Sequence, residues 1–302
     1  MQTEPRFWIA FNSGIIALLA VDLYIFHRKT RTVGWRESVA WTAVWIGLSL
    51  SFNAWIWHWK GEGKAVEFLA GYLIEYSLSI DNMFVFVLIF SFLKIKPEHQ
   101  YRVLFWGILG ALAMRGGMIV LGVRLVARFN WILYLFGLFL LVTGIRMFFK
   151  KNRDSMATNR IVCFCAKWMR VTPETHGSKF FLRENGRWVM TQLVLALLVV
   201  DVMDLVFAVD SIPAVFAVTT DSFIIYTSNI CAILGLRSLY FLLAHLANRF
   251  VYLHYGLASV LCFIGVKMLV ADWVTVPATV SLVVVAFMLG ASIAASLETG
   301  PD

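Results

Sequence analysis

The chain is dominated by apolar stretches long enough to cross a lipid bilayer. A spanning helix needs about 20 mainly apolar residues. Of the 302 residues, 60% are hydrophobic and only 15% are charged, so a water-soluble fold would have too much apolar surface to bury. We therefore expect an all-α polytopic membrane protein, with the lipid bilayer as its partner. Its nine predicted transmembrane helices lie at about 7–26, 39–59, 65–93, 103–123, 131–149, 190–218, 223–246, 251–271 and 277–297.

The basic residues predict an orientation in the membrane. The formal charge is +8, but Lys and Arg fall mainly in short loops, which is not the pattern of a nucleic-acid-binding face. They concentrate in 27–38, in 94–102 and above all in 150–189. Because cytoplasmic loops carry the excess of Lys and Arg, we expect the N-terminus outside and the C-terminus in the cytoplasm. Arg124 and Arg128, in an outward loop, count against this orientation.

Two regions of the chain repeat one order of polar residues within apolar segments. In each region a pair of acids is separated by six residues, an arginine lies in the next segment, and a Gly-x-basic-Met sequence closes the third. The matched pairs are Glu75 and Asp204, Asp81 and Asp210, Arg115 and Arg237, and Gly144 and Gly265. Three crossings per copy place the second copy upside down relative to the first. This is the inverted-repeat arrangement of many secondary transporters, whose binding site lies near the midplane between the copies.

The repeats divide the chain into five predicted regions. These are two N-terminal helices in 1–60, a first three-helix repeat in 61–150, a basic cytoplasmic loop in 151–189, a second three-helix repeat in 190–271, and a final helix with the C-terminal tail in 272–302.

The intramembrane acids are the candidate site. An ionisable group in a bilayer core costs at least about 2.5–3.5 kcal/mol, so such groups face the protein interior or a wet cavity. The candidate metal ligands are Glu75, Asp81, Asp201, Asp204 and Asp210. The supporting polar residues are Asn53, Asn82, Ser211 and Asn229, and the candidate counter-ions are Asp22, Arg115, Arg146, Arg237 and Lys267.

Helix geometry limits how these acids could meet. Residues six apart on a continuous helix differ by about 120°, so Asp204 and Asp210 do not share a face. If all the acids meet at one site, the second-repeat helix must be broken between them. Pro213, which lacks an N–H, predicts such a break just after Asp210.

The ligand types bear on the metal. Carboxylate, amide, hydroxyl and carbonyl oxygens suit hard or borderline ions such as Mn²⁺, Mg²⁺ and Ca²⁺. Separately, Cys163 and Cys165 with His176 in the cytoplasmic loop could bind a soft metal or act in redox chemistry. Buried acid–base pairs could also simply lock helices together, but structural pairing needs equal numbers, and here five acids face four bases.

Three segments carry a resemblance to a known family. GYLIEYSLSIDN, FAVDSIPAVFAVTTDSFIIYTSN and AILGLRSLYFLL resemble the signature stretches of the TerC (tellurium resistance) membrane family, and of its Alx branch in particular. Tyr76 and Asp201 depart from that pattern, where Lys and Glu would be usual. The resemblance implies a bacterial inner-membrane protein of nine helices linked to manganese export, with older links to tellurite resistance and redox modulation. It implies that the acids of the two motifs handle the metal.

Together these points predict a Mn²⁺ exporter of the secondary-carrier type that could be coupled to protons, with Mn²⁺ as the transported ion and no permanently bound cofactor. We expect no enzymatic activity, because no nucleophile-and-base constellation, cofactor motif or P-loop is present in the sequence. The alternative is a membrane scaffold for a stress-resistance complex that uses 150–189 as its docking surface.

Overall fold

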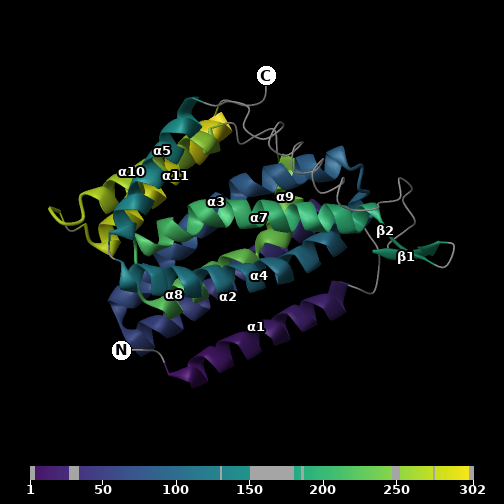
Figure 1. Cartoon of the computed structure of the whole chain (residues 1–302), viewed down its shortest axis with the longest axis horizontal. Helices are drawn as coiled ribbons and strands as arrows, with labels where there is room; N and C mark the ends of the chain where they lie inside the picture. The colour runs from purple at the N-terminus through teal and green to yellow at the C-terminus, as the bar shows by residue number, and fades with distance from the viewer. Residues whose placement is uncertain are drawn as a thin grey trace.

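The structure is a computed structural model, and its described residues form helices and one small hairpin (Figure 1). The described residues are 4–26, 34–129, 131–149, 180–184, 187–246, 252–274 and 276–298, and of Asp22, Asp81 and Asp210 only the backbone is described. The elements are α1 (Pro5–Phe26), α2 (Trp35–Lys60), α3 (Glu62–Phe92), α4 (Pro97–Arg128), α5 (Ile132–Phe149), β1 (Phe181–Glu184), β2 (Arg187–Met190), α7 (Gln192–Phe216), α8 (Ser222–Leu234), α9 (Leu236–Leu246), α10 (Leu253–Leu269) and α11 (Ala278–Glu298).

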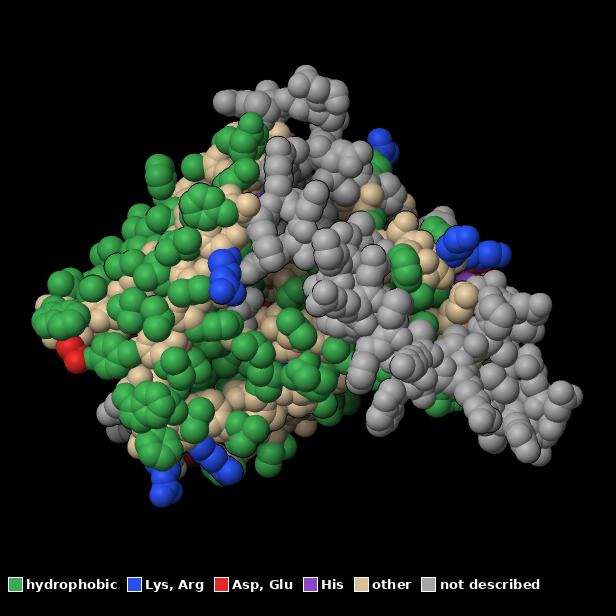
Figure 2. Space-filling view, turned by 45° about the horizontal axis from the view of Figure 1, so that its top comes forward, with side chains coloured by type: hydrophobic (Ala, Val, Ile, Leu, Met, Phe, Trp, Pro, Cys, Tyr) green, Lys and Arg blue, Asp and Glu red, His purple; other side chains and the backbone are tan. Residues whose placement is uncertain are grey.

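The helices confirm an all-α polytopic membrane protein. Within the described residues, six helices are long and apolar enough to cross a membrane, or seven if the bent pair α8 and α9 forms one span. Shorter apolar helices lie in α1 and α10, so every one of the predicted segments coincides with a helix or with this pair. Large apolar side chains are exposed on the outside, for example Leu121 at 67% and Phe287 at 74%. Figure 2 shows a face that hydrophobic side chains largely cover, as contact with lipid requires.

The hairpin lies just before α7 and was not expected from the sequence. Its antiparallel register pairs Phe181 with Met190 and Glu184 with Arg187. Thr191 follows it directly and caps α7, because its side chain accepts from the Leu193 N–H at 3.3 Å. The remainder of the predicted cytoplasmic loop, including Cys163 and Cys165, lies outside the described residues.

Some helix contacts occur at equivalent positions of the two predicted repeats. Helices α3 to α5 lie within the first and α7 to α10 within the second. In the crossing of α5 and α10, a Cβ added to Gly144 would lie 2.8 Å from the Ala258 carbonyl oxygen, and one added to Gly265 would lie 2.8 Å from that of Gly137. Gly144 and Gly265 are matched positions of the repeats, and so are Gly137 and Ala258, which lie seven residues before them. The contact of Gly144 with Ala258 is therefore the repeat equivalent of the contact of Gly265 with Gly137. Likewise α4 packs on α7 and α3 packs on α8, while α3 and α7 contact each other between them.

The helix break predicted near Asp210 is wrong. Helix α7 continues from Gln192 to Phe216 with Pro213 inside it. Pro213 stands in the last turn, where the helix is about to end, so the one backbone hydrogen bond it removes does not interrupt the helix upstream. The break lies in the next segment instead, where α8 and α9 meet at Gly235 with a bend of 41°.

Candidate intramembrane charge site

The centre of the candidate site is Arg115, whose side chain is fully buried in α4. Its Nη1 contacts Glu75 Oε1 of α3 in an ion pair. Its Nη2 donates to Asp204 Oδ1 of α7 at 2.8 Å and its Nε donates to Asp204 Oδ2 at 3.1 Å, which is the two-pronged geometry that suits a guanidinium and a carboxylate. Arg115 therefore holds one acid from each predicted repeat, and these two acids are the matched pair of the repeats.

Asn229 of α8 and Ser79 of α3 complete the contacts of Glu75. The Asn229 amide donates to Glu75 Oε2 at 2.8 Å, and its carbonyl oxygen accepts from Arg115 Nη1 at 3.4 Å. The Ser79 hydroxyl donates to Glu75 Oε1 at 3.4 Å. Glu75 and Asn229 are both 0% exposed. Four helices, α3, α4, α7 and α8, thus meet at one charged cluster inside the bundle.

The cluster carries more acid than base. Arg115 offers one positive charge to the two carboxylates of Glu75 and Asp204. Buried charges are costly to separate from water, and attraction repays that cost only where geometry and hydrogen bonding are good. The guanidinium lies between the two carboxylates, so it serves as their counter-ion in this structure.

Asp201 lies one turn before Asp204 in α7 and also faces α4, against Gly107 and Gly110 rather than Arg115. A Cβ added to Gly110 of α4 would lie 2.9 Å from both Asp201 side-chain oxygens, and one added to Gly107 would lie 3.5 Å from Oδ1. Asp201 Oδ1 is buried and has no hydrogen-bond partner among the described residues. The two glycines leave room on α4 for a carboxylate that is not engaged by Arg115.

Arg237 lies next to this cluster. It is 6% exposed, and its guanidinium stands over the Tyr101 ring at 4.5 Å from the centroid. Arg237 and Asp204 both line a cavity of about 20 Å³ between α3, α4, α7, α8 and α9, whose remaining walls are largely apolar. A cavity of this size holds about one water molecule.

The other predicted residues are more scattered. Asn82 is 9% exposed and Ser211 is 1% exposed, and Ser211 Oγ and Asn53 Oδ1 have no partner among the described residues. Arg146 is exposed on α5, and Lys267 donates to Ser281 Oγ at 2.8 Å, so neither is part of the Arg115 cluster. The side chains of Asp22, Asp81 and Asp210 lie outside the described ones.

The five-carboxylate metal site therefore stays a prediction. In the portion of the chain that the structure describes, no group of three or more His, Cys, Asp or Glu side chains could hold a metal ion. Glu75 and Asp204 are oxygen ligands of the kind that hard divalent ions accept, and Arg115 brings them to one place. Asp81 and Asp210 follow them by six residues in α3 and α7.

The structure contains a second polar cluster that the sequence did not predict. It joins Lys60, Lys64, Glu67, Thr219 and Asp221 at the end of the bundle where α3 and α8 begin. Taken singly, each of these residues is an ordinary polar or charged side chain beside a membrane span. The only local signal is Asp221 directly before an apolar segment, a typical N-cap position.

Comparison with known proteins assigns the family. The model for "Integral membrane protein TerC family" matches residues 60–299. An uncharacterised membrane protein of Myxococcus xanthus, STKORF319, is 50% identical over 296 residues, which cover 97% of this chain and 92% of the relative. A protein of Escherichia coli strain K12, provisionally named membrane-bound redox modulator Alx, is 45% identical over 93% of this chain and 91% of its own length. No solved structure matches the chain.

The family match spans the helices of both predicted repeats and contains Glu75, Arg115, Asp204 and Asn229. The Alx relatives match nearly the whole chain. The chain therefore belongs to the TerC family of integral membrane proteins.

Proposed function

We propose that the protein is a secondary carrier that exports a divalent cation, with Mn²⁺ as the best candidate, through the charge site between its two repeats. The observation that carries the proposal is the fully buried Arg115, which binds Glu75 of α3 and Asp204 of α7 at once. The oxygen ligands are compatible with Mn²⁺, Mg²⁺ and Ca²⁺. We favour Mn²⁺ because of the resemblance to TerC proteins.

The acid surplus favours a cation site over a structural lock. A lock between α4 and α7 is complete with Arg115 and Asp204. Glu75 adds a second carboxylate, and Asp201 adds a third that Arg115 does not engage. Counting Asp201 and Arg237, three described acids face two arginines before Asp81 and Asp210 are added. Functional intramembrane acids are costly for stability and are kept where they bind ions or protons.

The contacts suggest how such a carrier would cycle. In the empty state Arg115 neutralises some of the charge of Glu75 and Asp204. A divalent cation entering between the repeats would bind Asp81 and Asp210, with Glu75, Asp204 and Asp201 in support, and Arg115 would yield. Carboxylates can exchange a metal for protons, so proton antiport would supply the energy for export. We propose an inner-membrane location with the N-terminus outside, in line with the distribution of basic residues.

The test is metal flux into liposomes that contain the purified protein. Mn²⁺, Mg²⁺, Ca²⁺ and Zn²⁺ are compared across an imposed pH gradient for the wild type, Asp81→Asn and Asp210→Asn. The matched control is Asp272→Asn, which makes the same chemical change at an exposed position between α10 and α11. We expect Mn²⁺ flux in the wild type and the control and none in the two helix variants.

The same experiment addresses the scaffold alternative. No flux of any metal from folded, correctly inserted wild-type protein would reject the carrier and favour the scaffold. Replacing 151–189 by a neutral linker separates the two further, because a scaffold would lose its docking surface while a carrier would keep its flux.

A further inference from the structure

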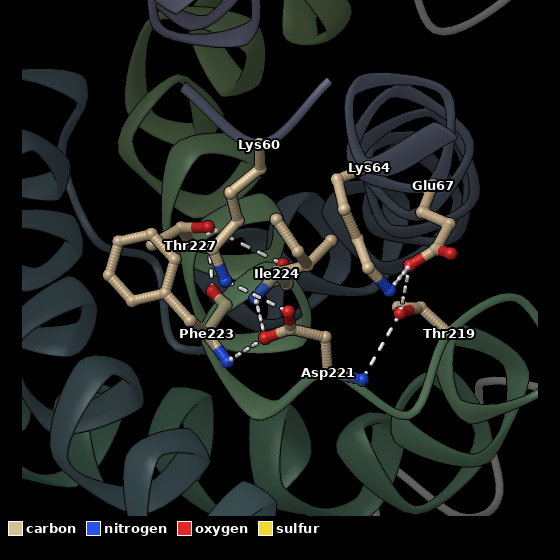
Figure 3. A network of polar contacts seen from close by, with 8 residues as sticks. All are labelled: Lys60, Lys64, Glu67, Thr219, Asp221, Phe223, Ile224 and Thr227. Atoms are coloured by element: carbon tan, nitrogen blue, oxygen red, sulfur yellow. Dashed lines mark hydrogen bonds and ion pairs between the residues drawn. The ribbon is translucent and has the colours of Figure 1, made fainter. Parts of the chain in front are cut away.

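A network of polar contacts closes one end of the seam between α3 and α8 (Figure 3). Lys60 Nζ at the end of α2 donates to Asp221 Oδ2 at 2.9 Å. Lys64 Nζ at the start of α3 donates to Glu67 Oε2 at 2.6 Å, and the Thr219 hydroxyl donates to the same oxygen. The Asp221 backbone N–H donates to Thr219 Oγ1 at 3.1 Å, which joins the two ion pairs into one chain of contacts. The network thus ties α2 and α3 to the α7–α8 connection.

Asp221 also organises the start of α8. Its Oδ1 accepts from the Phe223 N–H at 3.0 Å and from the Ile224 N–H at 3.4 Å, so it caps the helix while it pairs with Lys60. Burial alone would raise the pKa of Asp221, but Lys60 and the two N–H donors outweigh it and hold this pKa below its ordinary value. Asp221 is therefore a charged partner of Lys60 at neutral pH.

The network includes residues of α3 and α8, as the charge site does, and it is separated from the charge site by the same number of residues along both helices. Glu67 precedes Glu75 by eight residues in α3, and Asp221 precedes Asn229 by eight at the start of α8. Eight residues of helix span about 12 Å. The network therefore lies about two turns from the contact between Glu75 and Asn229, toward the end where both helices begin.

Between network and site, α3 and α8 are pressed together. A Cβ added to Gly71 would lie only 2.9 Å from Ser228 Oγ, and Ser228 is 0% exposed. At this level of the seam α3 and α8 are in close contact, and widening the seam requires the two helices to move apart. A buried apolar cluster that includes Phe68 and Phe223 also joins the starts of α3 and α8. The network adds the polar contacts there, and these must break before the two helix ends can separate.

The partial exposure of the network suits a contact that opens and closes. The side chains of Lys60 and Asp221 are 14% and 16% exposed, and those of Lys64 and Glu67 are 36% and 20% exposed. Ion pairs within reach of water are easily broken and remade, because water replaces the lost partner. The Arg115 cluster has no such access, since Arg115 and Glu75 are both fully buried.

We propose that the Lys60–Asp221 and Glu67–Thr219 contacts form a gate that controls access from this end of the bundle to the Arg115 site. The gate is closed in this structure, and it opens when these contacts break and α3 separates from α8. By the predicted orientation this end faces the outside, so the gate would govern release of the exported ion. The proposal rests on the transport function proposed above, but its test does not require transport.

The test uses a thiol in the seam as a reporter. Ser228→Cys is placed in a protein whose four natural cysteines are replaced by Ser, and its reaction with a membrane-impermeant maleimide is timed from each face of reconstituted vesicles. The gate variant is Asp221→Asn, since Asn caps helices as well as Asp but cannot pair with the Lys60 charge. Lys60→Met breaks the same pair from the other side and leaves Asp221 untouched as a cap. A protein with Cys262 as its single cysteine reports on general loosening, because Cys262 packs against Gly144 in the α5–α10 crossing.

We expect the Ser228→Cys reporter to be protected in the parent protein and to react about fivefold faster or more in both gate variants, from one face only, with the Cys262 rate unchanged. An unchanged Ser228→Cys rate in both variants would overturn the gate, whether or not the wild type carries metal. Equal acceleration at Cys262 would also overturn it, because the network would then be a general stabiliser. Absence of metal flux in the wild type, with the reporter behaving as expected, would reject only the transport function.

Discussion

Replacing Arg115 by Met tests a fully buried charge at the centre of the candidate site. The substitution keeps an unbranched side chain in α4 but removes the three contacts to Asp204 and Glu75. Removing one partner of a buried ion pair costs about 3–5 kcal/mol, because the other charge is left buried and uncompensated. Here two carboxylates are left, with Asp204 about 5% and Glu75 0% exposed, so we expect a loss in the upper half of that range.

The loss is measured by thermal unfolding in detergent, followed by the fluorescence of the 12 tryptophans. At about 2 °C per kcal/mol for a chain of this size, Arg115→Met is expected to lower Tm by about 8–10 °C. The triple variant Arg115→Met, Glu75→Gln, Asp204→Asn removes all three charges and is expected to regain most of this loss. A drop below about 2 °C for the single variant, or a triple variant no more stable than the single one, would refute the reasoning that the carboxylates depend on Arg115.

Three further predictions concern packing, pH and hydrogen bonding. Gly265→Ala is expected to destabilise the protein by about 1–3 kcal/mol or more in the same melt, because its Cβ would lie 2.6 Å from a backbone nitrogen of α5. The control is Gly117→Ala, which is expected to be neutral or slightly stabilising because nothing lies within 4 Å of its Cβ. Because the pKa of Asp221 is lowered in the folded protein, its pair with Lys60 stabilises the fold above the unfolded pKa of about 3.9, and this stability is lost as pH falls through the lower folded pKa. In melts from about pH 6 downward, Tm is therefore expected to fall less for Asp221→Asn than for the wild type, and equal declines would contradict this. Asn229→Leu is expected to cost about 1–3 kcal/mol, because Glu75 Oε2 loses its buried donor, and a variant as stable as the wild type would show that this contact carries no energy.

The sequence alone predicted the helices, and it located the intramembrane charges as candidates for pairing, for a clear physical reason. Long apolar stretches have no alternative to spanning helices, and acids within them need a partner. Arg115 was therefore a candidate counter-ion, and in the structure it contacts Glu75 and Asp204. The hydrogen bond between Asn229 and Glu75 could not be predicted from the sequence, because it depends on how α8 packs against α3.

The failures have equally physical causes. Pro213 suggested a broken helix, but a proline in the last turn removes one bond only, so α7 stays continuous and the bend appears at Gly235. The network around Asp221 brings together residues more than 150 positions apart, which only the packing of α2, α3 and α8 reveals. Whether Asp81 and Asp210 join the Arg115 site depends on side chains outside the described ones.

The most direct test of the central claim is equilibrium binding of Mn²⁺ to the purified protein. Free Mn²⁺ is counted by its electron paramagnetic resonance signal in titrations of the wild type, of Asp204→Asn with Asp210→Asn, and of the exposed control Asp272→Asn. The account predicts a saturable site in the wild type and in the control that is lost in the double variant and that releases Mn²⁺ as pH falls and the carboxylates bind protons. Equal binding by the double variant and the wild type, or no saturable binding by folded wild-type protein, would contradict a metal site built on the intramembrane acids.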